Sequence, residues 1–222
     1  MTRAISVADL KTRIRQQTEQ TSSKFISDDE LLNYIDLAAT ELYDLLVTQF
    51  QDYFLHFAKF DTIKDVNVYA LPANFYKMRD LDYTIGDKTD SMEKIPFSNR
   101  KLYMNQVFAG YRFERLKYCI AGNTLIVLPT PQQAIPVTMW FVPTMPRITS
   151  DSQMVAGFGG YEDLLIQDCC ARIAIKAEED PRPFERKKAL LIERIEAAAR
   201  QRDVGSPDSV IDSTGVTYSV LY

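Results

Sequence analysis

The sequence predicts an α+β protein, mainly α, in which a helical bundle carries an inserted antiparallel β region and an extended C-terminal tail. Apolar residues recur at helical spacing near both ends of the chain, whereas the middle alternates aromatic and β-branched residues between short turns. A strand-like run closes the sequence. We therefore expect residues 1–50 and 160–203 to form the helical bundle core, residues 51–159 the mainly-β insert, and residues 204–222 the tail.

Composition limits the function classes. The 222 residues are 46% hydrophobic and 25% charged, which is typical of a folded soluble protein. No apolar run approaches the roughly 20 residues that cross a bilayer, and the N-terminus lacks the apolar core of a secretory signal, so we expect no membrane partner and synthesis in the cytoplasm. A net charge of −4 argues against phosphate neutralisation as the main task. The partners are predicted to be proteins.

The three cysteines indicate neither a metal site nor a disulfide framework. Cys119 stands alone and Cys169 is adjacent to Cys170, whereas a zinc site needs several Cys or His ligands at short regular spacings. This pattern suits a reducing compartment.

A central helix is predicted over residues 27–49. Ser27 can accept a hydrogen bond from the backbone N–H of Glu30 while the Glu30 carboxylate reaches back to Ser27, and Asp28 and Asp29 complement the helix dipole. Apolar residues recur in two adjacent rows. The first row is Leu31, Ile35, Ala38, Leu42 and Leu45, and the second is Leu32, Ala39, Tyr43, Leu46 and Phe50.

Two apolar rows require partners on two sides of this helix. The first row is expected to meet two C-terminal helices of the same subunit, and the second either the β insert or a neighbouring subunit. We therefore assign helical packing and subunit contacts to a set of five residues, which are Leu31, Ile35, Leu42, Tyr43 and Phe50.

The remaining elements follow from the same patterns. A shorter helix with a basic outer face is expected over residues 7–20, capped by Ser6. The insert is predicted to contain antiparallel strands joined by short turns, with one short helix over residues 98–107 capped by Ser98. Paired strands with a turn at residues 65–67 are placed within residues 53–69, and further strands at about residues 78–85, 92–95, 112–120, 124–128 and 137–142. Helices are expected again from Tyr161 and over residues 184–202, separated by Pro181 and Pro183.

The end of the chain is apolar after a polar linker. Val216, Tyr218, Val220 and Tyr222 alternate on one face of a strand-like run. Such a run suits addition to the edge of another protein's sheet. These four residues are predicted to form a partner-binding segment.

No catalytic or metal-binding residue is predicted. His56 is the only histidine and lies in an aromatic strand, where a packing role is typical. Residues 157–160 are glycine-rich but lack the Lys-Ser/Thr of a phosphate loop, and a hinge is the simpler interpretation. The carboxylates at Asp80 and Asp82 and at residues 178–180 lack a third ligand group at a diagnostic spacing. We therefore expect a protein that is not an enzyme and needs no cofactor.

Three stretches in the same order resemble the head-to-tail adaptor (connector) proteins of tailed bacteriophages. They are residues 28–35 (DDELLNYI), residues 69–79 (YALPANFYKMR), and residues 137–148 (VTMWFVPTMPRI) followed by residues 161–163 and the helical sequence through residue 203. The likeness covers most of residues 25–212.

The resemblance implies a structural protein of the virion, assembled in the host cytoplasm, and no catalysis. In that family about twelve copies form a ring at the head-tail junction, where the C-terminal segment docks on the portal. For this chain the docking segment would be Val216, Tyr218, Val220 and Tyr222. Tail nozzle or fibre proteins would lie below, and genomic DNA would pass through the channel without specific binding, which an acidic wall favours.

Two other functions remain open from the sequence. One is a neighbouring tail protein, such as a nozzle or tail-completion subunit. The other is a nucleic-acid-binding module in which cations lie beside the aromatic residues Tyr111 and Phe113. Its cations would be Lys11, Arg13, Arg15, Arg112, Arg115 and Lys117.

Overall fold

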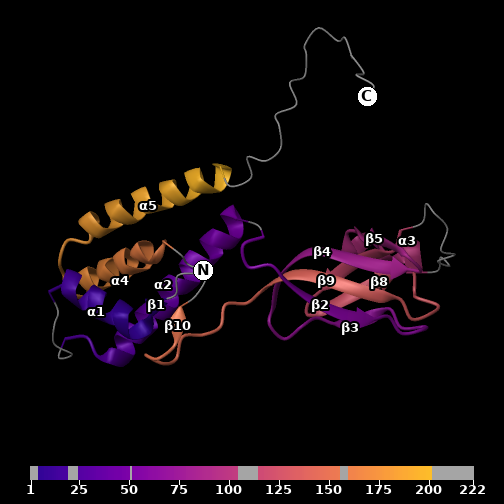
Figure 1. Cartoon of the computed structure of the whole chain (residues 1–222), viewed down its shortest axis with the longest axis horizontal. Coiled ribbons are helices and arrows are strands. Elements are labelled where there is room, and N and C mark those ends of the chain that lie inside the picture. Colours follow the sequence, from indigo (N-terminus) through magenta and orange to yellow (C-terminus); the bar gives the residue numbers. More distant parts are fainter. Residues whose placement is uncertain (1–4, 20–24, 51, 105–114, 156–159, 202–222) are drawn as a thin grey trace, which may run out of the picture.

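The computed structural model describes residues 5–19, 25–50, 52–104, 115–155 and 160–201. The molecule is elongated, with four long helices at one end and two four-stranded sheets at the other (Figure 1). The predicted α+β class is confirmed. The division into a bundle core, an insert and a tail stays a prediction.

The helical end is built from α1 (Val7–Gln17), α2 (Asp28–Gln49), α4 (Glu162–Lys176) and α5 (Arg182–Gln201). Helices α2 and α4 each contact the other three helices. Side chains on several sides of α4 are buried. Cys169 and Cys170 point to different sides of this helix, and both are buried. Burial raises the pKa of the Cys170 thiol to about 12, so both cysteines are core residues of low reactivity.

The predicted start of α2 is correct, but its capping box is only half formed. The Ser27 side chain accepts from the backbone N–H of Glu30 at 3.2 Å. The Glu30 carboxylate does not return to Ser27, as the sequence led us to expect. It accepts from the Tyr34 hydroxyl at 2.9 Å and from Lys176 of α4 at 2.6 Å, because a cationic donor stabilises a carboxylate more than a neutral backbone N–H does.

The last residue of α1 and the first and last residues of α5 differ from those that the sequence predicts. Ser6 caps α1 by accepting from the backbone N–H of Asp9 at 3.0 Å, as predicted, and the helix ends at Gln17. Helix α5 begins at Arg182. Pro183 therefore lies inside its first turn, where a proline is tolerated because its missing N–H would have no helical acceptor.

A short strand pair lies with the helices. Strand β1 (Ile5–Ser6) pairs antiparallel with β10 (Met154–Val155). Val142, Ile148 and Val155 belong to the same buried apolar cluster as α1, α2 and α4. The segment after residue 141, which the sequence placed in the β insert, thus packs on the helices.

The other end is a pair of packed sheets. The first has the order β2 (His56–Asp61), β9 (Pro136–Pro143), β4 (Phe75–Ile85) and β5 (Lys88–Ser91). The second has the order β3 (Val68–Ala70), β8 (Thr124–Leu128), β7 (Lys117–Ala121) and β6 (Glu93–Lys94). Alternate side chains of both enclose one buried cluster, to which Leu81, Met139, Phe141, Leu125 and Val127 belong.

Two predictions within the sheets are corrected. Strand β6 pairs with β7 in parallel, so the region is not wholly antiparallel. The helix expected over residues 98–107 is a 3₁₀ turn (Phe97–Asn99) followed by α3 (Arg100–Met104), and its N-cap is Pro96 without a side-chain cap, not Ser98. Residues 105–114, with the predicted start of the next strand, lie outside the described residues.

Candidate assembly surfaces

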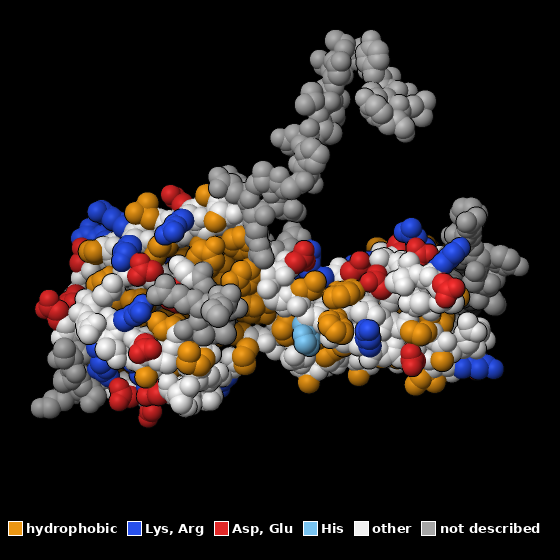
Figure 2. All heavy atoms as spheres, viewed as in Figure 1, with side chains coloured by type: hydrophobic (Ala, Val, Ile, Leu, Met, Phe, Trp, Pro, Cys, Tyr) orange, Lys and Arg blue, Asp and Glu red, His pale blue; other side chains and the backbone are white. Residues whose placement is uncertain are grey.

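Aromatic rings join the helical end to the sheets. The centroids of Tyr43 and Phe54 lie 4.5 Å apart, and those of Tyr53 and Phe54 lie 4.7 Å apart. Phe50 lies 5.8 Å from Tyr53 and 6.3 Å from Tyr161, which precedes α4. In a space-filling view, apolar side chains gather near the middle of the molecule, between α5 and the sheets (Figure 2). The five aromatic residues of these ring contacts are named the aromatic junction, and they are Tyr43, Phe50, Tyr53, Phe54 and Tyr161.

A polar contact within the aromatic junction connects α2 to the end of β9. The Tyr43 hydroxyl donates to the backbone carbonyl of Pro143. Burial raises the pKa of Tyr43 to about 12, with smaller contributions from Tyr76 and Asp44. The phenol therefore stays protonated, and it remains a donor, throughout the neutral range.

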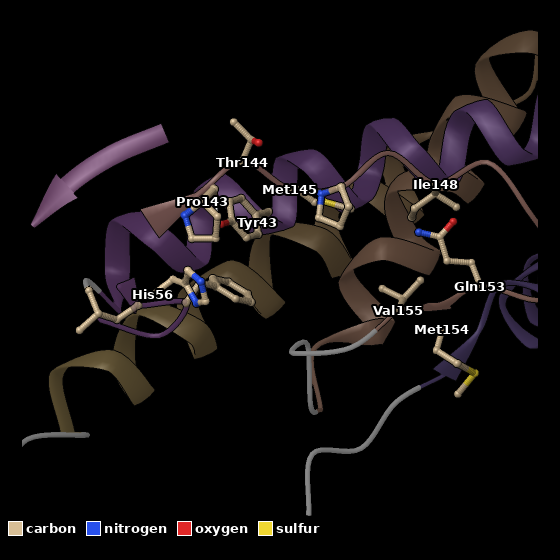
Figure 3. Close-up of a pocket in the computed structure, with 12 residues that line it drawn as sticks. Tyr43, His56, Pro143, Thr144, Met145, Ile148, Gln153, Met154 and Val155 are labelled. Atoms are coloured by element: carbon tan, nitrogen blue, oxygen red, sulfur yellow. Dashed lines mark hydrogen bonds between the residues drawn. The ribbon is translucent and has the colours of Figure 1, made fainter. Parts of the chain in front are cut away.

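Next to the aromatic junction lies an apolar groove of about 300 Å³. Figure 3 shows its wall formed by Tyr43 of α2, by His56 at the start of β2 and by the chain that leaves β9. Leu55 and Met154 also line it and are 39% and 53% exposed. Among the described residues, its lining is Tyr43, Phe54, Leu55, His56, Pro143, Thr144, Met145, Pro146, Ile148, Gln153, Met154 and Val155.

The groove suits an apolar chain segment better than a reactive substrate. His56 is its one titratable side chain apart from Tyr43, and the His56 ring packs edge-on against Phe141 at 5.7 Å. Among the residues that the structure describes, no carboxylate, cysteine or lysine lines the groove. The packing role that the sequence indicated for His56 agrees with this ring contact.

An ion-pair network joins three helices away from the groove. Asp168 of α4 accepts from Lys188 of α5 at 2.7 Å and from Arg172 at 2.8 Å. Lys188 also donates to Glu41 of α2 at 2.8 Å. Burial raises the pKa of Asp168, but the two cationic donors outweigh it, and the net shift is below the ordinary value of 3.8. The network thus stays ionised and holds α5 on α2 and α4.

The outer face of the first sheet exposes an aromatic pair. Phe57 of β2 lies opposite Trp140 of β9, with ring centroids 5.5 Å apart, and Phe57 is 50% exposed. Trp140 donates its indole N–H to Asp82 at 2.7 Å. Asp82 also accepts from Ser91, as does Asp80, so hydrogen bonds within the sheet account for both carboxylates. Strand β2 is an edge of this sheet.

The structure places the predicted packing residues inside the subunit. Leu31, Ile35, Leu42, Tyr43 and Phe50 are all buried, and all belong to the helical cluster. Whether any of them also contacts a neighbouring subunit stays a prediction. The predicted segment Val216, Tyr218, Val220 and Tyr222 lies outside the described residues, as do residues 157–159 of the glycine-rich stretch.

The cations proposed for nucleic-acid binding do not form one surface. Lys11 is paired with Asp151 at 2.6 Å and Arg15 with Asp28 at 2.8 Å, both at the helical end. Lys117 is paired with Glu93 in the second sheet, at the opposite end of the molecule (Figure 1). Arg112, Tyr111 and Phe113 lie outside the described residues. Three of the six cations thus already have carboxylate partners.

Within the described part of the chain, no cluster of three or more His, Cys, Asp or Glu side chains is placed to hold a metal ion. None of its helices combines the length and apolar character needed to cross a membrane.

The comparison with protein families is decisive. Residues 5–211 match the family model described as SU10 adaptor protein. The chain belongs to the SU10 adaptor protein family. A search among curated proteins found no match. The resemblance to phage adaptors is therefore confirmed, and the protein is a structural adaptor of a phage particle that associates with other phage proteins.

Sequence reasoning missed the groove. Its lining comes from the end of α2, the start of β2 and residues 143–155, and no periodic pattern links these segments. One available signal was the end of the strand alternation at Pro143, after which Met145 and Ile148 continue as apolar residues in a loop. Apolar residues in an irregular segment indicate contact with another surface.

Proposed function

We propose that the protein is a head-to-tail adaptor whose copies, twelve in number, form a ring that joins the portal to the tail and lets DNA pass through its channel. The carrying observation is the family match over residues 5–211. Tail nozzle or fibre proteins would bind the side of the ring that faces away from the portal.

The charge of α2 supports the channel part of the proposal. Its 22 residues contain six carboxylates and no Lys or Arg. Cations of other elements pair with four of them, which are Asp28, Glu30, Asp36 and Glu41. Asp29 and Asp44 remain as carboxylates that would repel phosphate and let DNA move past without being held.

A mass measurement tests the proposal most directly. The purified chain is measured by native mass spectrometry alone and with the portal protein of the same phage. We expect a closed ring of one defined copy number that binds the portal ring. A chain that stays monomeric under both conditions contradicts the proposal. Images of the virion that place the ring below another adaptor would instead identify a nozzle or tail-completion subunit.

The apolar end of the sequence defines a second test. Val216, Tyr218, Val220 and Tyr222 are proposed to dock on the portal. Deletion of residues 213–222 should leave a folded chain with unchanged helical circular dichroism that no longer joins heads carrying the portal. Replacing the same four residues by Ser is a matched variant that keeps the chain length. Portal binding at wild-type strength by both variants would disprove the role of this segment.

A further inference from the structure

The side of α5 that faces away from the other helices carries two exposed arginines around an exposed leucine. Ile195 and the half-buried Leu191 and Ile192 face the other helices. On the opposite side, Arg186, Leu190 and Arg194 are exposed at four-residue spacing, and Leu190 is 65% exposed. Within the described part of the chain, neither arginine forms an ion pair. We name these three residues the α5 outer face.

The outward side of α2 is its chemical counterpart. Asn33, Leu37, Thr40 and Asp44 are exposed along one stripe of the helix, and Leu37 is 52% exposed. The helix contains no cation, and the negative charge of this stripe is that of Asp44, which also accepts from the Tyr76 hydroxyl at 3.0 Å. We name these four residues the α2 outer face. The α2 outer face places Leu37 among polar and acidic side chains, whereas the α5 outer face places Leu190 between two arginines.

Charge decides which faces can meet. Two α5 outer faces would bring arginines together, and two α2 outer faces would bring carboxylates together, so both like pairings are unfavourable. An α5 outer face on an α2 outer face pairs opposite charges and covers both leucines. The same chemistry already operates inside the subunit, where Lys188 of α5 donates to Glu41 of α2 at 2.8 Å.

We propose that the α5 outer face of one copy docks on the α2 outer face of the next copy, with Leu190 against Leu37 and the arginines beside Asp44. The two faces differ, so the contact is heterologous, and repetition of such a contact closes a ring when the rotation between copies permits it. This inference rests on the proposed ring and assigns its subunit interface.

Charge reversal on each face tests the interface. One variant combines Arg186→Glu with Arg194→Glu, and a second combines Thr40→Lys with Asp44→Lys. All four residues are exposed, so both variants should keep the helical circular dichroism and melting temperature of the wild type. We expect the concentration needed for half-assembly to rise at least about tenfold in each variant, measured by native mass spectrometry with the portal present if the wild type requires it.

Mixing the variants gives a sharper result than either alone. Each variant alone brings like charges together, but in an equimolar mixture every contact between alternating copies pairs opposite charges, so the mixture should again form rings, with the two variants in equal number. A chain with all four substitutions restores opposite charges and should assemble again. The control combines Lys88→Glu with Lys101→Glu, two exposed residues in the sheet end, and should assemble like the wild type.

The outcomes separate this interface from the proposed function. If the wild type forms a ring and both reversed variants form it equally well, the interface is wrong and the ring remains. If the wild type stays monomeric with and without portal, both proposals are wrong. Failure of the fourfold variant to assemble, with its fold intact, would also contradict the charge pairing.

Discussion

The two ends of the molecule are held together in different ways. The sheet end is built from a continuous stretch, residues 56–143, whose strands are joined by backbone hydrogen bonds around a buried apolar cluster. The helical end collects α1 and α2 from one end of the chain, α4 and α5 from the other, and a segment that follows β9. Besides the backbone pairing of β1 with β10, side chains make long-range contacts there, including Lys176 with Glu30 and Lys188 with Glu41.

This difference shows where each end is vulnerable. Backbone pairing in the sheets tolerates side-chain changes outside the core, because the ladder does not use side chains. The helical end depends on particular side chains that reach between helices. Ile148 and Val155 follow the sheet end in sequence but pack with the helices in space, and Tyr76 of β4 donates to Asp44 of α2, so the two ends touch through several side chains.

The largest expected effects come from core truncations, one at each end. Leu42 is 0% and Phe141 is 1% exposed. Leu42→Ala should lower the free energy of unfolding by about 2–5 kcal/mol and Phe141→Ala by about 3–5 kcal/mol, because each leaves a cavity. Exposed Leu102, at 66%, supplies the control Leu102→Ala.

Urea unfolding followed by two probes tests whether the ends unfold separately. The single tryptophan, Trp140, lies in β9 and reports the sheets, whereas circular dichroism of the helices reports the other end. We expect Leu42→Ala to shift the helical transition more than the tryptophan transition, and Phe141→Ala to do the reverse. Equal shifts in both probes would show one cooperative unit.

A smaller loss is expected from Asp168→Asn, which leaves Lys188 and Arg172 without their buried acceptor. The Asp168 side chain is 7% exposed, but Lys188 and Arg172 keep 22% and 34% exposure, and water screens them in part. We expect a loss of about 1–2 kcal/mol in the free energy of unfolding. Lys187→Gln, which breaks an exposed 3.4 Å pair with Asp163, should cost less than about 0.5 kcal/mol. A loss no greater than that of the control would contradict a structural role for the network.

The same carboxylate predicts a pH dependence. The pKa of Asp168 is below its ordinary value of 3.8 in the folded protein, so the unfolded chain binds its proton more readily. Its stabilisation is therefore complete above the unfolded pKa and is lost as pH falls through the folded one. The difference in unfolding free energy between the wild type and Asp168→Asn should be constant from pH 7 to about pH 5 and shrink below about pH 4. A difference that grows on acidification would have the wrong sign.

The smallest expected effect concerns the junction. Tyr43→Phe removes the hydroxyl that donates to Pro143 while keeping the ring, so the loss should be about 1 kcal/mol, the net value of one hydrogen bond. Tyr76→Phe is the control, because its hydroxyl bonds Asp44 at an exposed position. If the aromatic junction couples the two ends, Tyr43→Phe should also increase the difference between the urea midpoints reported by Trp140 and by circular dichroism. Identical behaviour of the two variants would argue against that coupling.

Local signals in the sequence predicted the elements that depend on neighbours in the chain. Ser27 and Ser6 cap their helices as expected, because the acceptor and its N–H lie three residues apart. Buried rows on α2 also followed from spacing, since helical geometry alone places Leu31, Ile35 and Leu42 on one side. The family could also be recognised from the sequence, because the match over residues 5–211 depends on the order of residues along the chain and not on contacts between distant segments.

Only the tertiary structure decided what depends on distant partners. The Glu30 carboxylate bonds Lys176, 146 residues away, and not its local cap. Three other features also join segments that are separated in the chain. They are the parallel pairing of β6 with β7, the groove beside Tyr43, and the packing of Val155 against the helices. Spacing within one segment determines which side chains share a face, but the partner of that face is determined by packing across the whole chain.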